Sequence, residues 1–160
     1  MSISVITADY HDTQQAKDVM ACLSAYALDP MGGGAALSEF VTGNLIPRLQ
    51  QQSNVFSVLC YVDGKVAALA NCVEGFSTFS AKPLINFHDI VVLEPFRGQG
   101  LTQYLFEYVE KIAIERGCCK LTLEVLEGNA VAKKSYQKNG FGSYELDPEM
   151  GQAVFWQKKL

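Results

Sequence analysis

Two long stretches of the chain repeat apolar residues every three or four positions, the spacing that places them on one face of a helix. The first, residues 12–29, opens with Asp12 and Gln15, which together have the pattern of a capping box. The second, residues 100–116, is followed by Gly117, a residue suited to the left-handed position that closes many helices. The apolar positions are Ala16, Val19, Met20, Leu23 and Ala27 in the first stretch, and Leu101, Leu105, Tyr108, Val109 and Ile112 in the second.

Local signals predict two shorter helices. Ser38 is a plausible N-cap for a helical region that Pro47 breaks or kinks. Asn129 opens another helix, which Gly140 closes. Residues 29–34, DPMGGG, are expected to form a loop, because three consecutive glycines weaken a helix.

Apolar and β-branched runs between these helices predict strands. Asp63-Gly64 lies between two such runs, which indicates a hairpin over residues 54–73 with a type I′ turn. Residues 74–83 are expected to form a loop, and residues 84–93 a central strand. Further strands are expected at 3–8, 120–126, 141–146 and 152–160, the last two joined by a turn. The order β-α-α-β-β-β-α-β-α-β-β predicts an α/β (α+β) fold.

Composition narrows the class of protein. A chain of 160 residues is expected to form a single domain, residues 1–160. The net charge of −4 argues against a nucleic-acid partner, and no apolar stretch approaches the ~20 residues of a membrane span. The five cysteines form no CxxC pair and there are only two histidines, so we expect no metal site. Reduced thiols and the lack of a signal-peptide pattern predict a cytoplasmic protein.

The second long helix begins at an unusual turn. Arg97, Gly98 and Gly100 stand between the central strand and the first apolar helical position. Helix-initial amides have no intrahelical partner and lie at the positive end of the helix dipole, so glycines there expose an anion site suited to phosphate. The sequence has neither a P-loop nor the third glycine of a dinucleotide fingerprint, and the RGQG turn alone is weak evidence.

A second motif strengthens this interpretation. In EGNAVAKKSYQKNGF, residues 127–141, Asn129, Ala132 and Tyr136 are spaced to lie close to one helix face. Together, RGQGL and N-x-x-A-x-x-x-Y-x-x-x-G-F resemble the Gcn5-related N-acetyltransferase (GNAT) family over residues 84–141. The predicted element order extends the resemblance more loosely over the whole chain.

The resemblance implies a fold and a cosubstrate. It implies a mixed, mostly antiparallel central sheet with splayed parallel strands 4 and 5, about four helices, and acetyl-CoA bound without a metal. The pantetheine arm is expected along the end of the central strand, and the pyrophosphate on the R-x-x-G-x-[GA] loop, where Thr102 replaces the usual Gly or Ala. Lys133 and Lys134 could meet the 3′-phosphate or form a solvated face. The cofactor-binding candidates are Val91, Val92, Leu93, Arg97, Gly98, Gln99, Gly100, Leu101, Thr102, Asn129, Ala132, Lys133 and Tyr136.

The resemblance also implies acetyl transfer to a primary amine of a small molecule or peptide by direct attack in a ternary complex. Tyr136 is then the candidate general acid for the departing thiolate. The base stays open. His88 has an imidazole suited to proton uptake near neutrality, and Asp89 or a water chain to Glu124 are alternatives. Alternation along a strand predicts that His88 and Asp89 face opposite ways.

The acceptor is expected near the first two helices and their connection, as in similar proteins. Tyr26, Asp29, Met31 and Asp89 are the candidate contacts, because carboxylates suit a cationic amine and the glycines after Met31 would permit a mobile lid. A homodimer is compatible with the sequence. The alternative function is a non-catalytic CoA or acyl-CoA sensor or interaction domain, which keeps the phosphate site and lacks a productive base.

Overall fold

The computed structural model describes all 160 residues, which form two compact units, Met1–Leu123 and Glu124–Leu160. The single domain expected over the whole chain stays a prediction, and the two units are taken one at a time. The first unit contains β1 (Ile3–Thr7), α1 (Thr13–Leu28), the 3-10 helix η1 (Pro30–Gly32), α2 (Glu39–Leu49), β2 (Val55–Val62), β3 (Lys65–Ser77), β4 (Lys82–Val92), η2 (Glu94–Phe96), α3 (Leu101–Glu115) and β5 (Leu121–Leu123). The second contains α4 (Ala130–Lys138) and η3 (Pro148–Met150).

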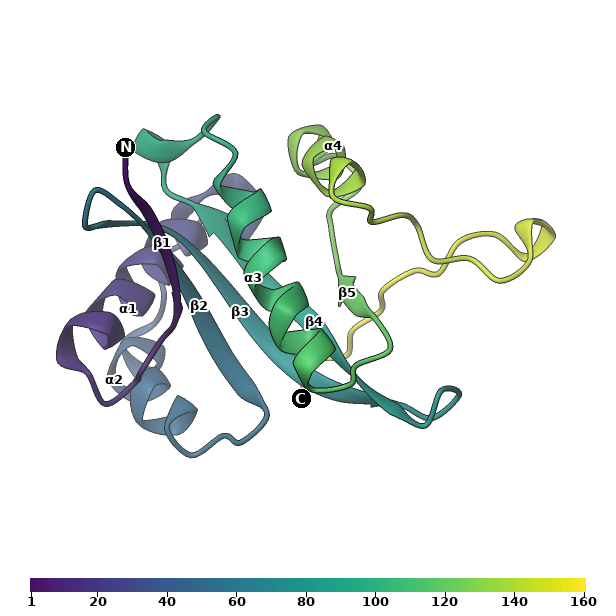
Figure 1. Ribbon diagram of the computed structural model, residues 1–160, viewed down its shortest axis with the longest axis horizontal. Coiled ribbons are helices and arrows are strands. Elements are labelled where there is room, and N and C mark those ends of the chain that lie inside the picture. The colour runs from purple at the N-terminus through teal and green to yellow at the C-terminus, as the bar shows by residue number, and fades with distance from the viewer. The chain divides into compact units, whose positions relative to one another are not determined.

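The first unit is built on one five-stranded sheet in the order β1-β2-β3-β4-β5 (Figure 1). The strands from β1 to β4 pair antiparallel, and β4 pairs with β5 in parallel. With four α-helices, this mixed sheet confirms the fold class predicted from the sequence. No helix in the structure has both the length and the hydropathy that a membrane span requires.

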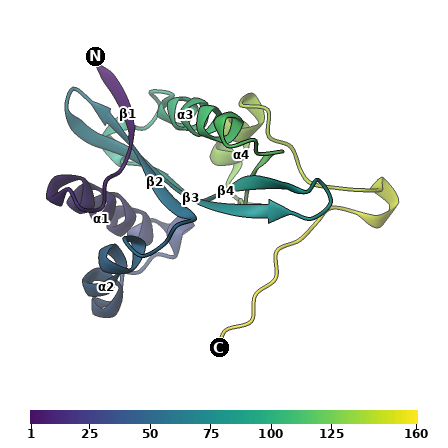
Figure 2. The ribbon, with the colours of Figure 1, turned by 60° about the horizontal axis from the view of Figure 1, so that its bottom comes forward.

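Helices cover both faces of the sheet. Figure 2 shows α1 and α2 on one side, which we call the α1 face, and α3 on the other, the α3 face. On the α1 face, Val19 and Cys22 are buried in one cluster with Leu59, Leu69 and Val91. The predicted apolar stripe of α3 is confirmed, since Leu101, Leu105 and Val109 are almost fully buried. Each such side chain contributes about 1.5–3 kcal/mol by burial.

Several local signals are confirmed. Asp63 and Gly64 have φ values of 48° and 76°, as the two central residues of a type I′ turn require. Gly117 closes α3 at φ 69°. Asp12 caps α1 by accepting the Gln15 amide at 2.8 Å. The reciprocal half of the capping box is wrong, because the Gln15 side chain accepts the amide of Asp9, at 2.8 Å.

Other boundaries differ from the prediction. Residues 74–83 are mostly strand, because β3 and β4 form a long hairpin that stays paired to Ser77 and Lys82. The outer ends of β3 and β4 contain glycine and polar residues, so this part of the sequence lacks the apolar pattern that predicts a strand. Helix α2 is not broken at Pro47 but ends two residues later, at Leu49. β5 is shorter than the strand expected over 120–126.

The second unit lacks the two final strands that the sequence predicts. Residues 141–146 and 152–160 contain aromatic and apolar side chains that are common in strands, yet only one antiparallel bridge joins them, between Glu145 and Gln152. A two-stranded ribbon without further strands is marginal, so residue types that favour strands do not by themselves produce a sheet here. Asn129 and Gly140 begin and end α4 as expected, with Gly140 at φ 85°.

Candidate active site

β4 carries one more residue than its partner β3 at His88. Asn71 pairs with Asp89 and Cys72 with Phe87, so His88 has no opposite residue. Such a β-bulge shifts the alternation of side chains by one. Phe87 therefore packs edge-to-face on Phe106 of α3 at 4.9 Å, whereas Asp89 lies on the α1 face. The regular alternation that we expected here does not hold.

Asp89 belongs to a row of polar side chains that the sequence did not predict. Asn71 Nδ2 donates to Asp89 Oδ2 at 3.0 Å, and Ser57 Oγ donates to Asn71 Oδ1 at 2.6 Å. The Tyr10 hydroxyl lies 2.8 Å from Ser57 Oγ. The sequence signal for this row is a polar residue within the apolar part of each strand, Ser57 in β2 and Asn71 in β3. His88 itself is exposed.

The edge of β4 that faces β5 is partly open. The two strands pair only from Ile85–Leu121 to Phe87–Leu123, while β4 continues to Val92. Leu93 N donates to Ala67 O of β3 at 2.9 Å. By alternation, Val91 also directs its main-chain groups to β3, and Ile90 and Val92 direct theirs to the open edge. Ile90 belongs to the strand end at which the pantetheine arm is expected.

The glycine turn has the geometry that the sequence indicates. Gly98 and Gly100 have φ values of 77° and 76°. An added Cβ at either position would meet nothing within 4 Å, so the conformation and not crowding calls for glycine. The first helical hydrogen bond of α3 runs from Gln103 N to Gly100 O, 3.1 Å, so the amides of residues 98–102 precede it. These amides stand at the positive end of α3.

Arg97 ties this turn to two other segments. Its Nε donates to the Val92 carbonyl at 3.1 Å, and its Nη2 donates to Asp29 Oδ2 at 2.9 Å. The Arg97 side chain is 53% exposed. A guanidinium has five N–H groups, so these two bonds leave donors for an anion.

The connection between α1 and α2 is well ordered by hydrogen bonds. Asp29 Oδ1 accepts the Met31 amide at 2.8 Å, which together with Arg97 lowers the pKa of Asp29. Gly34 N donates to Asp29 O at 3.0 Å. A Cβ at Gly32 would lie 1.9 Å from the carbonyl oxygen of Tyr26, so only glycine fits. The glycines therefore form a tight turn, and the mobile lid stays a prediction.

Tyr26 connects this turn to the sheet. It is half-buried against the core of the α1 face. Burial raises the pKa of Tyr26, and the negative charges of Asp89 and Asp29 raise it further. The structure thus brings three of the four predicted acceptor residues into one electrostatic neighbourhood, with Met31 exposed beside them.

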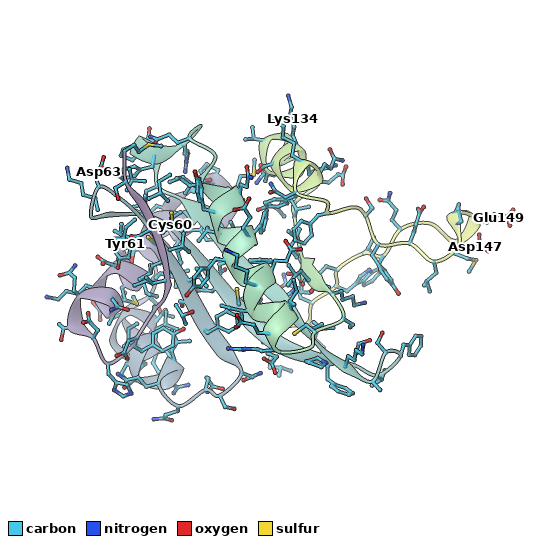
Figure 3. The ribbon with its side chains drawn as sticks, viewed as in Figure 1. Cys60, Tyr61, Asp63, Lys134, Asp147 and Glu149 are labelled. Atoms are coloured by element: carbon cyan, nitrogen blue, oxygen red, sulfur yellow. The ribbon has the colours of Figure 1, made fainter.

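The candidates of the second unit form a group of their own. Asn129 Oδ1 accepts the Ala132 amide at 3.1 Å, and Lys133 pairs with Glu127. Tyr136 contacts the ring of Phe141, with centroids 6.4 Å apart. Lys134 points away from α4 (Figure 3). Their functional roles stay predictions.

Two buried thiols offer little chemistry. Burial raises the pKa of both Cys60 and Cys72, the latter to about 12. A thiol that keeps its proton is a poor nucleophile. Both thiols are therefore poorly suited to a mechanism in which a cysteine carries the acetyl group as a covalent intermediate.

Geometry and sequence together define the class of protein. An open strand edge followed by a glycine turn at a helix N-terminus is an arrangement suited to a phosphate-bearing ligand. The model of the Acetyltransferase (GNAT) family matches residues 19–141, and the chain belongs to this family.

Solved structures of the same fold agree with this assignment. An integron cassette protein from the mobile metagenome of V. cholerae is 21% identical, with 99% of this chain and 93% of that chain covered and a TM-score of 0.78. An aminoglycoside acetyltransferase from an uncultured soil metagenomic sample, in complex with sisomicin, is 15% identical with 99% and 96% covered and a TM-score of 0.78. AAC(6')-Iy in complex with a CoA bisubstrate analog is 15% identical with 100% of both chains covered and a TM-score of 0.77.

Proposed function

We propose that the protein is an acetyl-CoA-dependent N-acetyltransferase that acetylates a primary amine of a cationic small molecule or peptide by direct attack in a ternary complex. Family membership supports acetyl transfer. The observation that carries the acceptor side is the bulge at His88, which puts the Asp89 carboxylate on the face covered by α1 and α2. Oδ1 of Asp89 accepts no hydrogen bond within the chain, so it is free to meet an ammonium group.

Acetyl-CoA would lie along the open edge of β4. The amides of residues 98–102 would hold the pyrophosphate, with Arg97 adding a charge-assisted bond. Main-chain groups of Ile90 and Val92 would pair with the pantetheine arm. Thr102 would contribute its amide like the Gly or Ala that is usual there.

Chemistry at the amine begins with a proton. A lysine-like ammonium has a pKa of ~10.4 and no lone pair, so a base must take its proton before attack. Asp89 has the geometry for this task, with His88 and a water chain to Glu124 as alternatives. Tyr136 would donate a hydrogen bond or proton to the departing thiolate. We expect Tyr136→Phe to lower kcat and to leave acetyl-CoA binding almost unchanged.

Two carboxylates and a half-buried tyrosine suit a cationic acceptor. The similar structures include an aminoglycoside acetyltransferase bound to sisomicin, so aminoglycosides are the first class to test. The assay is thiol release from acetyl-CoA with sisomicin, spermidine, lysine and a peptide with a free N-terminus. Saturable turnover with one of them is the expected result. Acetyl-CoA binding without turnover of any amine would favour the sensor function.

The glycine turn offers a matched pair of variants for the cofactor side. Gly100 and Gly117 stand at opposite ends of α3 with similar φ values, 76° and 69°, and open space around both. Alanine at either position costs about 1–2 kcal/mol of backbone strain. We expect Gly100→Ala to weaken acetyl-CoA binding about tenfold or more in calorimetry, because strain is relieved by moving the amides. Gly117→Ala should leave binding unchanged, and equal weakening in both would remove the turn from the site.

A further inference from the structure

The row of polar side chains crosses three neighbouring strands of the α1 face. Ser57 of β2 pairs directly with Asn71 of β3, and Asn71 pairs directly with Asp89 of β4. Tyr10, from the segment between β1 and α1, continues the row beyond Ser57. Ser57 is fully buried between apolar residues of β2. A buried hydroxyl in such a strand costs free energy unless it is hydrogen-bonded. The hydrogen bonds of Ser57 therefore offset the cost of burying it.

Counting protons gives the row a direction. An ionised carboxylate only accepts, so Asn71 presents its Nδ2 to Asp89 and its Oδ1 to Ser57. Ser57 has a single hydroxyl proton, which it donates to Asn71. The Tyr10 hydroxyl must therefore donate to Ser57 Oγ. Every donor in the row points toward Asp89, and hydrogen bonds aligned in this way polarise and strengthen one another.

The far end of the row is held in place. Gln50 Nε2 donates to the Tyr10 carbonyl at 2.9 Å. Burial raises the pKa of Tyr10, so its hydroxyl keeps its proton and stays a donor. The row thus starts at a fixed, partly buried phenol and ends at a carboxylate that has one oxygen uncommitted.

We propose that Tyr10, Ser57 and Asn71 are positioning residues that fix Oδ2 of Asp89 and direct Oδ1 to take the proton of the acceptor ammonium. The inference rests on the proposed function. In this step one N–H bond of R–NH3+ breaks, its proton forms an O–H bond on Oδ1, and the electron pair of the broken bond stays on nitrogen for attack on the thioester. The proton leaves Asp89 for solvent before the next turnover. Asn71 donates to Oδ2 before and after the transfer, so the row does not rearrange.

Other titratable groups around Asp89 affect how its proton uptake is read. Tyr26 on α1 and Cys72 on β3 both have raised pKa values and stay neutral near neutral pH. Asp29 is paired with Arg97. His88 is the neighbour whose residue type ordinarily titrates near neutrality, so the measurement is best made with His88→Gln as the parent protein.

The direct test is a carboxyl titration of the full chain by NMR, which needs no acceptor. The Asp89 signal is identified by its loss in Asp89→Asn. We expect Asn71→Leu to raise the titration midpoint by about one pH unit, because a donor to the anion is lost. Ser57→Ala should raise it in the same direction by less. Tyr61→Phe, which removes a hydroxyl from the same strand and face as Ser57, is the control and should leave the midpoint unchanged.

Kinetics separate positioning from simple packing. Ser57→Ala should lower kcat about tenfold at unchanged KM for acetyl-CoA, and should cause no further loss in Asp89→Asn. Two results would overturn the inference. One is an equal loss of kcat when Ser57→Ala is made in the wild type and in Asp89→Asn, and the other is an Asp89 titration midpoint that does not move in Asn71→Leu and Ser57→Ala. Absence of turnover by the wild type would instead overturn the proposed function, since the titration reports the row by itself.

Discussion

Two carboxylates of the α1 face show how differently the same group can be used. Asp18 of α1 is only 8% exposed, and both of its oxygens are occupied, by Gln14 Nε2 at 3.0 Å and the Tyr61 hydroxyl at 2.8 Å. Asp89 of β4 is half-buried and has one oxygen occupied, by Asn71. Each accepts one donor from a strand of the sheet, Tyr61 of β2 for Asp18 and Asn71 of β3 for Asp89, yet only Asp89 keeps an oxygen for another molecule.

The number of occupied oxygens decides whether a carboxylate mainly stabilises the fold or is available for a reaction. A fully bonded acid strengthens the fold and cannot take part in a reaction without losing those bonds. The charge of Asp18 also acts on its surroundings. Burial and this charge together raise the pKa of Cys22 to about 12 and raise the pKa of Tyr61. An acid with one free oxygen contributes less to the fold and can accept a proton.

The same substitution at both acids is expected to give the largest difference between them. Asp89→Asn should lower kcat/KM about 10²- to 10⁴-fold, the usual contribution of a general base, with a nearly unchanged Tm. Asp18→Asn should lower Tm and leave kcat/KM within a few-fold. Steady-state assays and thermal unfolding of both variants measure this. Similar activity losses in the two variants would show that the assignment of roles is wrong.

The next largest effect concerns the partner of the buried acid. Tyr61→Phe removes the donor to Asp18 and should lower the free energy of unfolding by about 1.5–3 kcal/mol, as expected for a bond to a charged group. Urea denaturation measures the change. Tyr108→Phe is the control, because its hydroxyl accepts the Thr7 amide at 3.1 Å in an exposed position. A loss as large in Tyr108→Phe would mean that burial of Asp18 adds nothing.

Alkaline pH should reveal the buried acid through its neighbour. The pKa of Cys22 rises from 9.0 to about 12 on folding, so its contribution is complete below pH 9.0 and is lost as pH rises toward about 12. Unfolding measured across this window should show less loss of stability in Cys22→Ala than in the wild type. An identical slope in both proteins would contradict the raised pKa of this thiol.

A third acid at the surface should give the smallest effect. The Met31 amide and Arg97 lower the pKa of Asp29, so its contribution is present above the ordinary value of 3.8 and is lost as pH falls through the lowered one. Exposure and salt screen this pair, so Asp29→Asn should change Tm only slightly at neutral pH. Thermal unfolding in low and high salt measures it. A large decrease in Tm that does not depend on salt would show that Asp29 stabilises the fold as Asp18 does.

The sequence predicted the parts of the site that depend on local geometry. Gly98, Gly100 and Gly117 have the positive φ values that their positions beside a helix indicate. Asp63-Gly64 forms the expected turn for the same reason. Such signals are visible because a left-handed residue excludes most side chains, so the residue type itself reports the conformation.

The parts that depend on pairing between strands were not predictable in this way. The bulge at His88 is a mismatch in residue count between β3 and β4, and neither strand shows it alone. The hydrogen bond between Ser57 and Asn71 follows from the register of β2 and β3, which periodicity does not give. The prediction of two C-terminal strands is wrong for a related reason, since residue types indicate a preference for extended backbone but not which segment pairs with it.

The offset between β3 and β4 makes the side chain presented on the α1 face depend on the number of residues in each strand. Inserting one residue into β3 opposite His88 would remove the bulge. With Phe87 held on the α3 face, regular alternation would then turn the Asp89 carboxylate toward the α3 face and bring His88 to the α1 face. One peptide unit added to β3 would thus exchange a carboxylate for an imidazole on the α1 face, and the sequence of the glycine turn would stay the same.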